Sequence, residues 1–130
     1  MDIKFTVPGP PVSKARARVT RWGSYTPPKT REATELVKKY LADVVDTRPW
    51  PISDGRKENR PDIGVSCKFY MRLKGHGADL DNLLKLVLDA GNGIAWVDDR
   101  QITKLIGEKF LYSDEPRTEV HIYTRNGGEL

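Results

Sequence analysis

The sequence predicts an α+β fold, in which two helices pack on a mixed or antiparallel sheet within a single domain, 1–130. Four segments alternate apolar and polar residues, which is the period of a strand: 2–7, 62–73, 102–112 and 118–124. Two further segments, 30–46 and 79–90, place apolar residues at helical spacing. The resulting order is β-α-β-α-β-β. A chain of 130 residues can bury roughly two-thirds of its unfolded surface, which is enough for one core.

The first predicted strand ends at Pro8, and a basic arm over about 8–31 follows it. Prolines and glycines interrupt this arm, so it cannot be helical throughout. Cationic side chains recur in it with period two at Lys14, Arg16 and Arg18, and in extended backbone all three face one side. Such a row suits contact with the phosphates of a nucleic acid.

A turn with two aromatic residues, "WGSY" at 22–25, is compatible with a small hairpin. Thr30 is a candidate N-cap for the first helix, and the Pro- and Gly-containing segment 47–61 reads as a loop. Cys67 alternates with apolar residues in the second predicted strand, so we interpret it as a buried residue and not as a nucleophile. A single cysteine also excludes an intramolecular disulfide and a Cys-rich zinc site.

The second predicted helix, in "GADLDNLLKLVLDAGNG", is unusually acidic for an apolar segment. Asp79 lies at its expected N-cap, and Asp81, Lys85 and Asp89 follow at i, i+4 and i+8 on one flank. A cap, a favourable helix dipole and exposed ion pairs would explain each of these residues singly. A further acidic pair, 98–99, follows soon after the helix, and we expect one of the pair to converge with the carboxylates at the helix start.

Charge is distributed unevenly along the chain, whose formal net charge is +4. Residues 1–40 hold nine Lys or Arg against three acidic residues, whereas residues 79–99 hold five Asp against one Lys. This asymmetry indicates a phosphate-binding surface beside a cation site, with solvated surface charge as the alternative. Crowded carboxylates resist ionisation unless a divalent cation neutralises them, and their oxygens suit Mg²⁺ or Mn²⁺.

These residues point to a Mg²⁺-dependent nuclease or phosphotransferase that acts on nucleic acid, because a bound metal can activate water for attack on a phosphodiester. An EF-hand does not fit, since Leu84 stands where the loop needs Gly and Ala90 where it needs Glu. A nucleotide-sugar transferase with a "DLD" motif is disfavoured, because 130 residues leave little room for its nucleotide-binding domain.

The segment "DLDNLLKLVLDAGNGIAWVDDRQI", 79–102, resembles the RusA family of Holliday junction resolvases, whose mark is D-x-D-N-L-x-K followed by D-D-x-Q. The first strand, the segment "PGPPVSKARAR" and the terminal strands are also similar, so the resemblance covers most of the chain. It implies a RusA-like fold and a homodimeric endodeoxyribonuclease that uses Mg²⁺, with Mn²⁺ as a substitute. Such an enzyme resolves four-way DNA junctions by paired, symmetric nicks in DNA recombination and repair.

The resemblance assigns four catalytic residues by position, and makes the three aspartates among them the metal ligands: Asp79, Asp81, Lys85 and Asp99. Asn82 would brace the carboxylates. Asp98 either ligates the metal or holds Gln101 and the turn, and Asp89 is expected to be structural. The "GHG" before the motif is less basic than the same stretch in many relatives, which puts a cation-rich contact there in doubt.

Candidate DNA-binding residues lie on the basic arm and its aromatic turn: Lys14, Arg16, Arg18, Arg21, Trp22, Tyr25 and Lys29. The two aromatic residues, and Trp96 further on, are candidates for stacking on unpaired bases, although core or dimer packing is preferred for Trp96. His76 is a conceivable general base, but a metal-activated water does not need one, and His121 is expected to be structural. Leu86 lies off the main apolar stripe and is a candidate for the dimer interface.

A four-way junction is approximately two-fold symmetric, so paired nicks need two active sites and hence two chains. Two alternative functions stay open: a branched-DNA-binding protein whose acidic cluster is structural, and a less selective flap or branch nuclease. No stretch approaches the about 18 apolar residues of a membrane span, and the N-terminus has no signal-peptide h-region. We therefore expect a cytoplasmic protein without membrane contact, of bacterial, phage or prophage origin.

Overall fold

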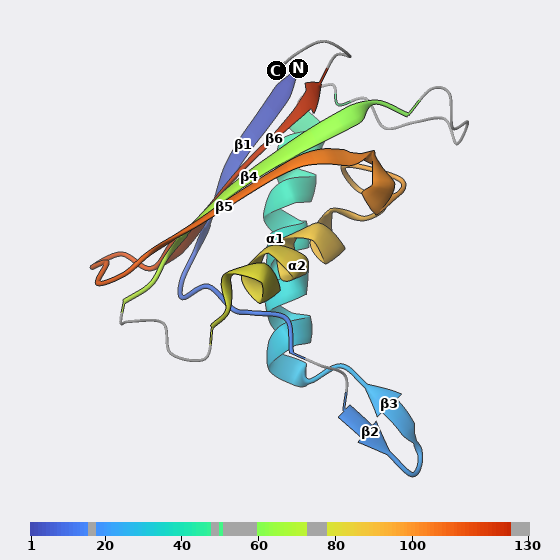
Figure 1. Cartoon of the computed structure of the whole chain (residues 1–130), viewed down its shortest axis with the longest axis vertical. Helices are drawn as coiled ribbons and strands as arrows, with labels where there is room; N and C mark the ends of the chain where they lie inside the picture. The colour runs from blue at the N-terminus through green and yellow to red at the C-terminus, as the bar shows by residue number, and fades with distance from the viewer. Residues whose placement is uncertain (16–17, 48–49, 51–59, 73–77, 126–130) are drawn as a thin grey trace.

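The structure is a computed structural model that describes residues 1–15, 18–47, 50, 60–72 and 78–125. Its main sheet has four strands in the order β1-β6-β4-β5 (Figure 1). Their bounds are β1 Asp2–Pro8, β4 Asp62–Tyr70, β5 Ile102–Phe110 and β6 Arg117–Arg125. Strand β6 is antiparallel to both β1 and β4, whereas β4 and β5 are parallel. The predicted α+β fold with a mixed sheet is therefore confirmed.

Two helices, α1 (Pro28–Thr47) and α2 (Leu80–Gly91), lie on one face of this sheet (Figure 1). Parallel neighbours in a sheet need a crossover, and α2 is the crossover between β4 and β5. Alternate residues of the strands face the helices, and in β4 these are the ones that sequence alternation predicts: Ile63, Val65, Cys67 and Phe69. Cys67 is fully buried, and this burial raises the pKa of its thiol to about 12. The interpretation of Cys67 as a core residue is confirmed.

Two expectations about the helices are wrong. Thr30 is not an N-cap, because α1 begins at Pro28, where the fixed φ of proline suits a first helical position. The hydroxyl of Thr30 is instead buried and accepts a hydrogen bond from Ala15 N at 3.1 Å, which ties the basic arm to α1. Leu86 is not a surface residue: it is 3% exposed, because α2 packs against both α1 and the sheet and so buries a wide arc.

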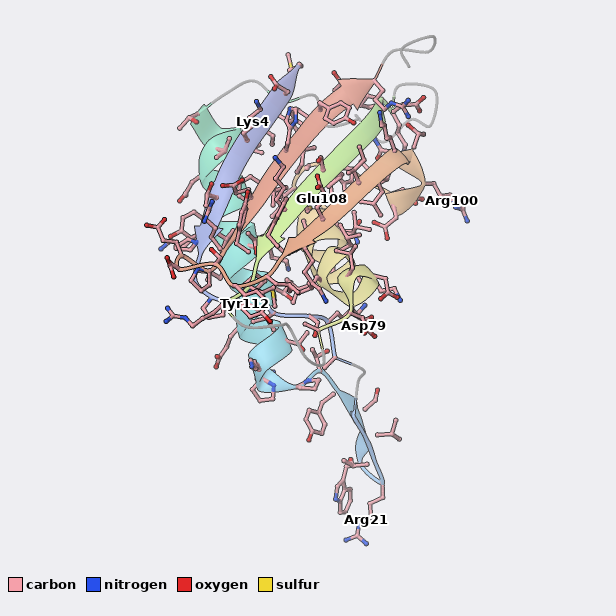
Figure 2. The ribbon with its side chains drawn as sticks, turned by 60° about the vertical axis from the view of Figure 1, so that its left-hand side comes forward. Lys4, Arg21, Asp79, Arg100, Glu108 and Tyr112 are labelled. Atoms are coloured by element: carbon pink, nitrogen blue, oxygen red, sulfur yellow. The ribbon has the colours of Figure 1, made fainter. Side chains whose placement is uncertain are left out.

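A second, two-stranded sheet forms a hairpin from β2 (Arg18–Thr20) and β3 (Gly23–Tyr25). The hairpin projects away from the body of the molecule beyond the start of α1, with Arg21 near its tip (Figures 1 and 2). It contains the turn that the aromatic "WGSY" segment indicates. Among the described residues, no helix combines the length and the apolar character that a membrane crossing requires.

Candidate active site

The start of α2 carries the first pair of candidate acids. Asp79 is the N-cap residue in extended backbone, and its carbonyl accepts the first helical bond from Leu83 N at 3.0 Å. Within the described helix, however, the Asp79 side chain makes no capping hydrogen bond. Both Asp79 and Asp81 are exposed, so two carboxylates stand on the surface at a helix start.

Lys85 lies one turn into α2, and its Nζ is 3.8 Å from Asp81 Oδ2. Both side chains are more than half exposed, so this ion pair contributes little to stability. The ion pair instead fixes a position, because it keeps the Lys85 ammonium beside the carboxylates of Asp79 and Asp81. Asp89, the third acid of this flank, instead pairs with Lys14 of the basic arm at 2.7 Å. This contact agrees with the structural role expected of Asp89.

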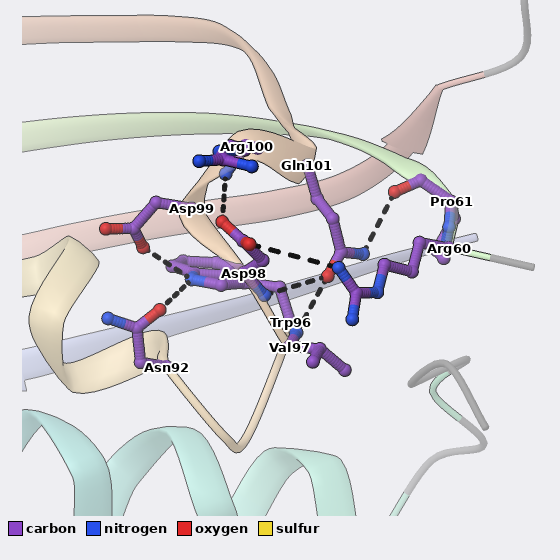
Figure 3. Close-up of polar contacts among 9 residues, drawn as sticks. All are labelled: Arg60, Pro61, Asn92, Trp96, Val97, Asp98, Asp99, Arg100 and Gln101. Carbon is purple, nitrogen blue, oxygen red and sulfur yellow. Dashed lines mark hydrogen bonds and ion pairs between the residues drawn. The ribbon is translucent and has the colours of Figure 1, made fainter. Parts of the chain in front are cut away.

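The second acidic pair belongs to a turn that precedes β5 (Figure 3). Asp98 is the N-cap of a 3₁₀ helix, η2 (Asp99–Gln101), and accepts a hydrogen bond from Arg100 N at 2.9 Å. The Gln101 Oε1 accepts from Val97 N at 2.7 Å and from Asp98 N at 3.1 Å, which completes a capping box. Asp98 was expected either to ligate the metal or to hold Gln101 and the turn. Its hydrogen bonds fit the second role.

Asp99 points to a different neighbour, the indole of Trp96 (Figure 3). The Nε1 of Trp96 donates to Asn92 Oδ1 at 2.9 Å and to Asp99 Oδ1 at 3.2 Å. Trp96 is fully buried, so the core role expected for it is confirmed, and it is unavailable for stacking on bases. Gly91 permits this packing, because a Cβ there would collide with the indole ring.

One chain therefore does not bring its acidic residues together. Asp79 lies at the start of α2, whereas Asp99 lies beside Asn92 at the other end of that helix. The helical rise from Asp79 to Asn92 is about 20 Å at 1.5 Å per residue. Figure 2 labels Asp79 and Arg100, the neighbour of Asp99, at different places on the molecule. Among the described residues, no group of three or more His, Cys, Asp or Glu side chains is placed to hold a metal ion. The expected convergence at the helix start does not occur within one chain.

The basic arm passes over the acidic helix before it reaches the hairpin. The backbone N of Lys14 donates to the carbonyl of Asn82 at 2.9 Å, and its side chain pairs with Asp89. Lys14 is thus held against α2 and is not one of a row of free cations. Arg16 and the side chain of Arg18 lie outside the described residues, as does His76.

The hairpin presents its side chains to solvent. Trp22 is 85% exposed, and Arg21 lies over its ring at 4.9 Å from the centroid. Tyr25 and Lys29 are also exposed. An exposed tryptophan beside an arginine is an unusual feature for a surface with no partner, and both groups suit nucleic acid.

Sequence reasoning missed the contacts that fix the acidic turn. The Nε2 of Gln101 donates to Pro61 O at 3.1 Å, and Arg60 Nη1 lies 3.9 Å from Asp98 Oδ2. It also missed the bond from Trp96 to Asp99. A buried tryptophan needs a partner for its N–H group, so the nearby Asp and Asn residues were the available signal.

His121, expected to be structural, lies on the uncovered face of the sheet. Its Nε2 is 2.9 Å from Asp2 Oδ2, and this hydrogen bond lowers the pKa of Asp2. The contact joins β6 to β1 and lies away from α2. It gives His121 a part in holding the sheet.

Comparison with known proteins defines the class of this chain. A family model described as endodeoxyribonuclease RusA matches residues 8–123. The uncharacterized protein YqaN of Bacillus subtilis (strain 168) is 30% identical over 138 aligned residues, covering 92% of this chain and 94% of that protein. The class is therefore that of an endodeoxyribonuclease, a hydrolase of phosphodiester bonds within DNA. The chain belongs to the RusA family, whose members are Holliday junction resolvases, which confirms the resemblance found in the sequence.

Proposed function

We propose that this protein resolves Holliday junctions by paired, symmetric nicks, using Mg²⁺ or, as a substitute, Mn²⁺. The observation that carries the proposal is the start of α2, where the exposed Asp79 and Asp81 stand beside Lys85. Membership of the RusA family supports branched DNA as the substrate. The exposed aromatic residues of the β2–β3 hairpin support contact with DNA.

The fit of a divalent cation rests on the chemistry of these oxygens. Hard carboxylate ligands suit Mg²⁺, and Asp79 is not committed to capping its helix. The carboxylates of Asp79 and Asp81, at the start of α2, would supply part of the ligand set of such a cation. Asp99, the third proposed ligand, would have to come from another chain, because its own Asp79 is a helix length away.

This chain's residues have separate tasks in the proposed reaction. Asp79, Asp81 and Asp99 would hold the cation, which when bound activates water and stabilises charge on the phosphate. Lys85 would bind the scissile phosphate and offset the negative charge that develops as water attacks and the leaving oxygen departs. Asn82, next to Asp81, would brace the carboxylates, and the hairpin would hold the junction arms. Two chains related by a two-fold axis would then match the symmetry of a four-way junction.

The first test compares the wild type with Asp81→Asn on a synthetic mobile four-way junction and on a linear duplex of the same sequence. We expect Asp81→Asn to lose cleavage under Mg²⁺ by roughly a thousand-fold or more, because the bound metal supplies several kcal/mol of transition-state stabilisation. Binding without metal should persist. Asp89→Asn is the matched control, since it removes the same charge from the same helix but pairs with Lys14.

Three other outcomes contradict the proposal. If the wild type binds the junction and does not cut it under Mg²⁺ or Mn²⁺, the protein is a branched-DNA-binding protein. If it cuts flaps and junctions equally, or makes unpaired nicks, it is a less selective branch nuclease. If Asp81→Asn cuts as well as Asp89→Asn, the acids at the start of α2 are not catalytic.

A further inference from the structure

The main sheet has one face that neither helix covers (Figure 1). Alternate side chains of β1, β4 and β6 point to the helices and form the core, so the intervening side chains of these strands point to the uncovered face. Antiparallel sheets commonly leave one face to solvent, and exposure alone therefore indicates no ligand. The groups that this face carries, and their arrangement, decide what it can bind.

A hollow of about 450 Å³ lies on this face, over β6 and its neighbours β1 and β4. The strand register arranges six of its lining side chains in two rows across the sheet: Lys4, His121 and Ser66, then Thr6, Glu119 and Lys68. The short side chains of Thr6 and Ser66 leave room between Lys4 and Lys68, which stand at opposite corners. This volume lies within the range of about 300–1,000 Å³ that ligand sites have.

The hollow offers positive charge that no ion pair within the described residues takes up. The ammonium groups of Lys4 and Lys68 form no ion pair or hydrogen bond with another described residue. The carboxylate of Glu119, which also lines the hollow, accepts a hydrogen bond from Arg117 Nε at 3.0 Å and is thereby paired. Ammonium and hydroxyl groups are donors that phosphate oxygens accept. The hollow therefore suits a phosphate group.

Aromatic rings stand on the sheet at both ends of the hollow. At one end a Cβ on Gly64 would collide with the ring of Tyr123, so this ring lies on the surface of β4. At the other end Tyr70 stacks on Phe110 with ring centroids 4.8 Å apart, and Arg117 lies 3.7 Å from the Tyr70 centroid. All three rings keep part of their surface exposed. The two ends are six residues of β6 apart, or about 20 Å.

We propose that the uncovered face binds a single strand of nucleic acid, with phosphates between Lys4 and Lys68 and bases on the rings of Tyr123, Tyr70 and Phe110. Aromatic rings stack on bases of any sequence, but only when the bases are unpaired, which favours a single strand over a duplex. A track of about 20 Å accommodates about four nucleotides, the lower end of the range for single-strand-binding folds. The site contains none of the acids of α2 and goes beyond the proposed function.

Glu108 is the feature of this face that opposes the ligand. It lies opposite Lys68 in the register with β5, and its side chain is exposed. Its carboxylate repels a phosphate bound at Lys68. Glu108→Gln should therefore strengthen single-strand binding by about two-fold. A weaker complex in this variant would contradict the placement of phosphates beside Lys68.

The main test measures the binding of a fluorescein-labelled oligothymidine of about eight nucleotides by fluorescence anisotropy, without metal. Lys68→Glu should weaken binding by about ten-fold, and should lower the slope of log affinity against log salt by about 0.7 for the lost phosphate contact. Lys39→Glu is the matched control, because it makes the same change of charge at an exposed position of α1, on the helix side of the sheet. It should bind nearly as the wild type does.

The contribution of the rings is tested at Tyr123. Tyr123→Leu keeps an apolar side chain over Gly64 but removes the ring, and it should weaken binding by about ten-fold. Tyr123→Phe keeps the ring and should bind as the wild type does. The melting temperatures of both variants show whether the sheet is intact. Equal binding by the two folded variants would contradict stacking on Tyr123.

Four further results overturn the site. One is equal binding by Lys68→Glu and Lys39→Glu. Another is a duplex that competes as well as the single strand, since the face would then recognise charge alone. The third is displacement of the oligonucleotide by inorganic phosphate at an equal concentration of phosphate groups. The fourth is binding that Trp22→Ala abolishes and Lys68→Glu leaves intact, which would assign the strand to the β2–β3 hairpin.

These measurements do not depend on cleavage. A protein that binds oligothymidine on this face and fails to cut junctions would contradict the proposed function and leave the single-strand site standing. A protein that cuts junctions and binds no oligothymidine would overturn the single-strand site alone.

Discussion

Gln101 holds the acidic turn to the rest of the fold. It is 6% exposed, and its side chain makes three hydrogen bonds, to the backbone of Val97, Asp98 and Pro61. The turn starts at the end of α2 and delivers the chain to β5, so its geometry fixes where the Asp99 carboxylate points (Figure 3). Gln101 is thus a positioning residue for a candidate metal ligand that it does not itself touch.

Gln101→Ala should lower the free energy of unfolding by about 2 kcal/mol, because two partly buried N–H groups lose their acceptor. Arg100→Ala is the control from the same turn, and it should stay within about 0.5 kcal/mol of the wild type because its side chain is exposed. Urea unfolding measures both. Equal stability of the two variants would mean that the Gln101 bonds do not hold this turn.

At the scale of elements, the β2–β3 hairpin stands out because its exposed tryptophan contributes no core contact. Trp22→Ala should therefore leave the melting temperature unchanged. It should weaken metal-free binding to a four-way junction by about 10- to 100-fold, since stacking on a base contributes about 1–3 kcal/mol. Fluorescence anisotropy with a labelled junction measures the binding.

Val19→Ala is the matched control for the hairpin, because Val19 is 83% exposed on the neighbouring strand and has no ring to stack. It should bind as the wild type does. Equal loss in the two variants would indicate that the hairpin acts through its shape and not through Trp22.

The helices and strands were predictable because their signals are local. Alternation from Ile63 to Phe69 marks a strand whatever lies around it, and the apolar spacing of α2 marks a helix. The role of Thr30 was not predictable, since its partner Ala15 comes from another segment. The burial of Leu86 depends on α1 and the sheet enclosing α2 together. Local patterns do not contain such contacts.

The acidic residues of the candidate site were identified from the motif, but their arrangement was not. Their separation follows from the topology: β5 runs parallel to β4, so α2 must cross the sheet between them. Asp79 and Asp99 stand at the two ends of that crossover. The spacing of these residues along the sequence cannot reveal their separation, because it does not specify whether β5 runs parallel or antiparallel to β4.

At the scale of the whole molecule, the proposed function needs two chains for two reasons that are independent of each other. Paired nicks in a two-fold symmetric four-way junction require two active sites. The length of α2 keeps Asp99 away from Asp79 of its own chain, so a site with all three acids would draw them from both chains. Each site would then depend on the association of the chains.

Mixing two inactive variants tests this sharing directly. In a dimer of Asp81→Asn with Asp99→Asn, one shared site carries both substitutions and the other carries neither. We expect each variant alone to be inactive and the re-associated mixture to recover about a quarter of the wild-type nicking rate, since half of the dimers are mixed and each has one intact site. Single nicks should outnumber paired ones. A mixture that stays inactive, although its chains are shown to exchange, would place all three acids of each site in one chain.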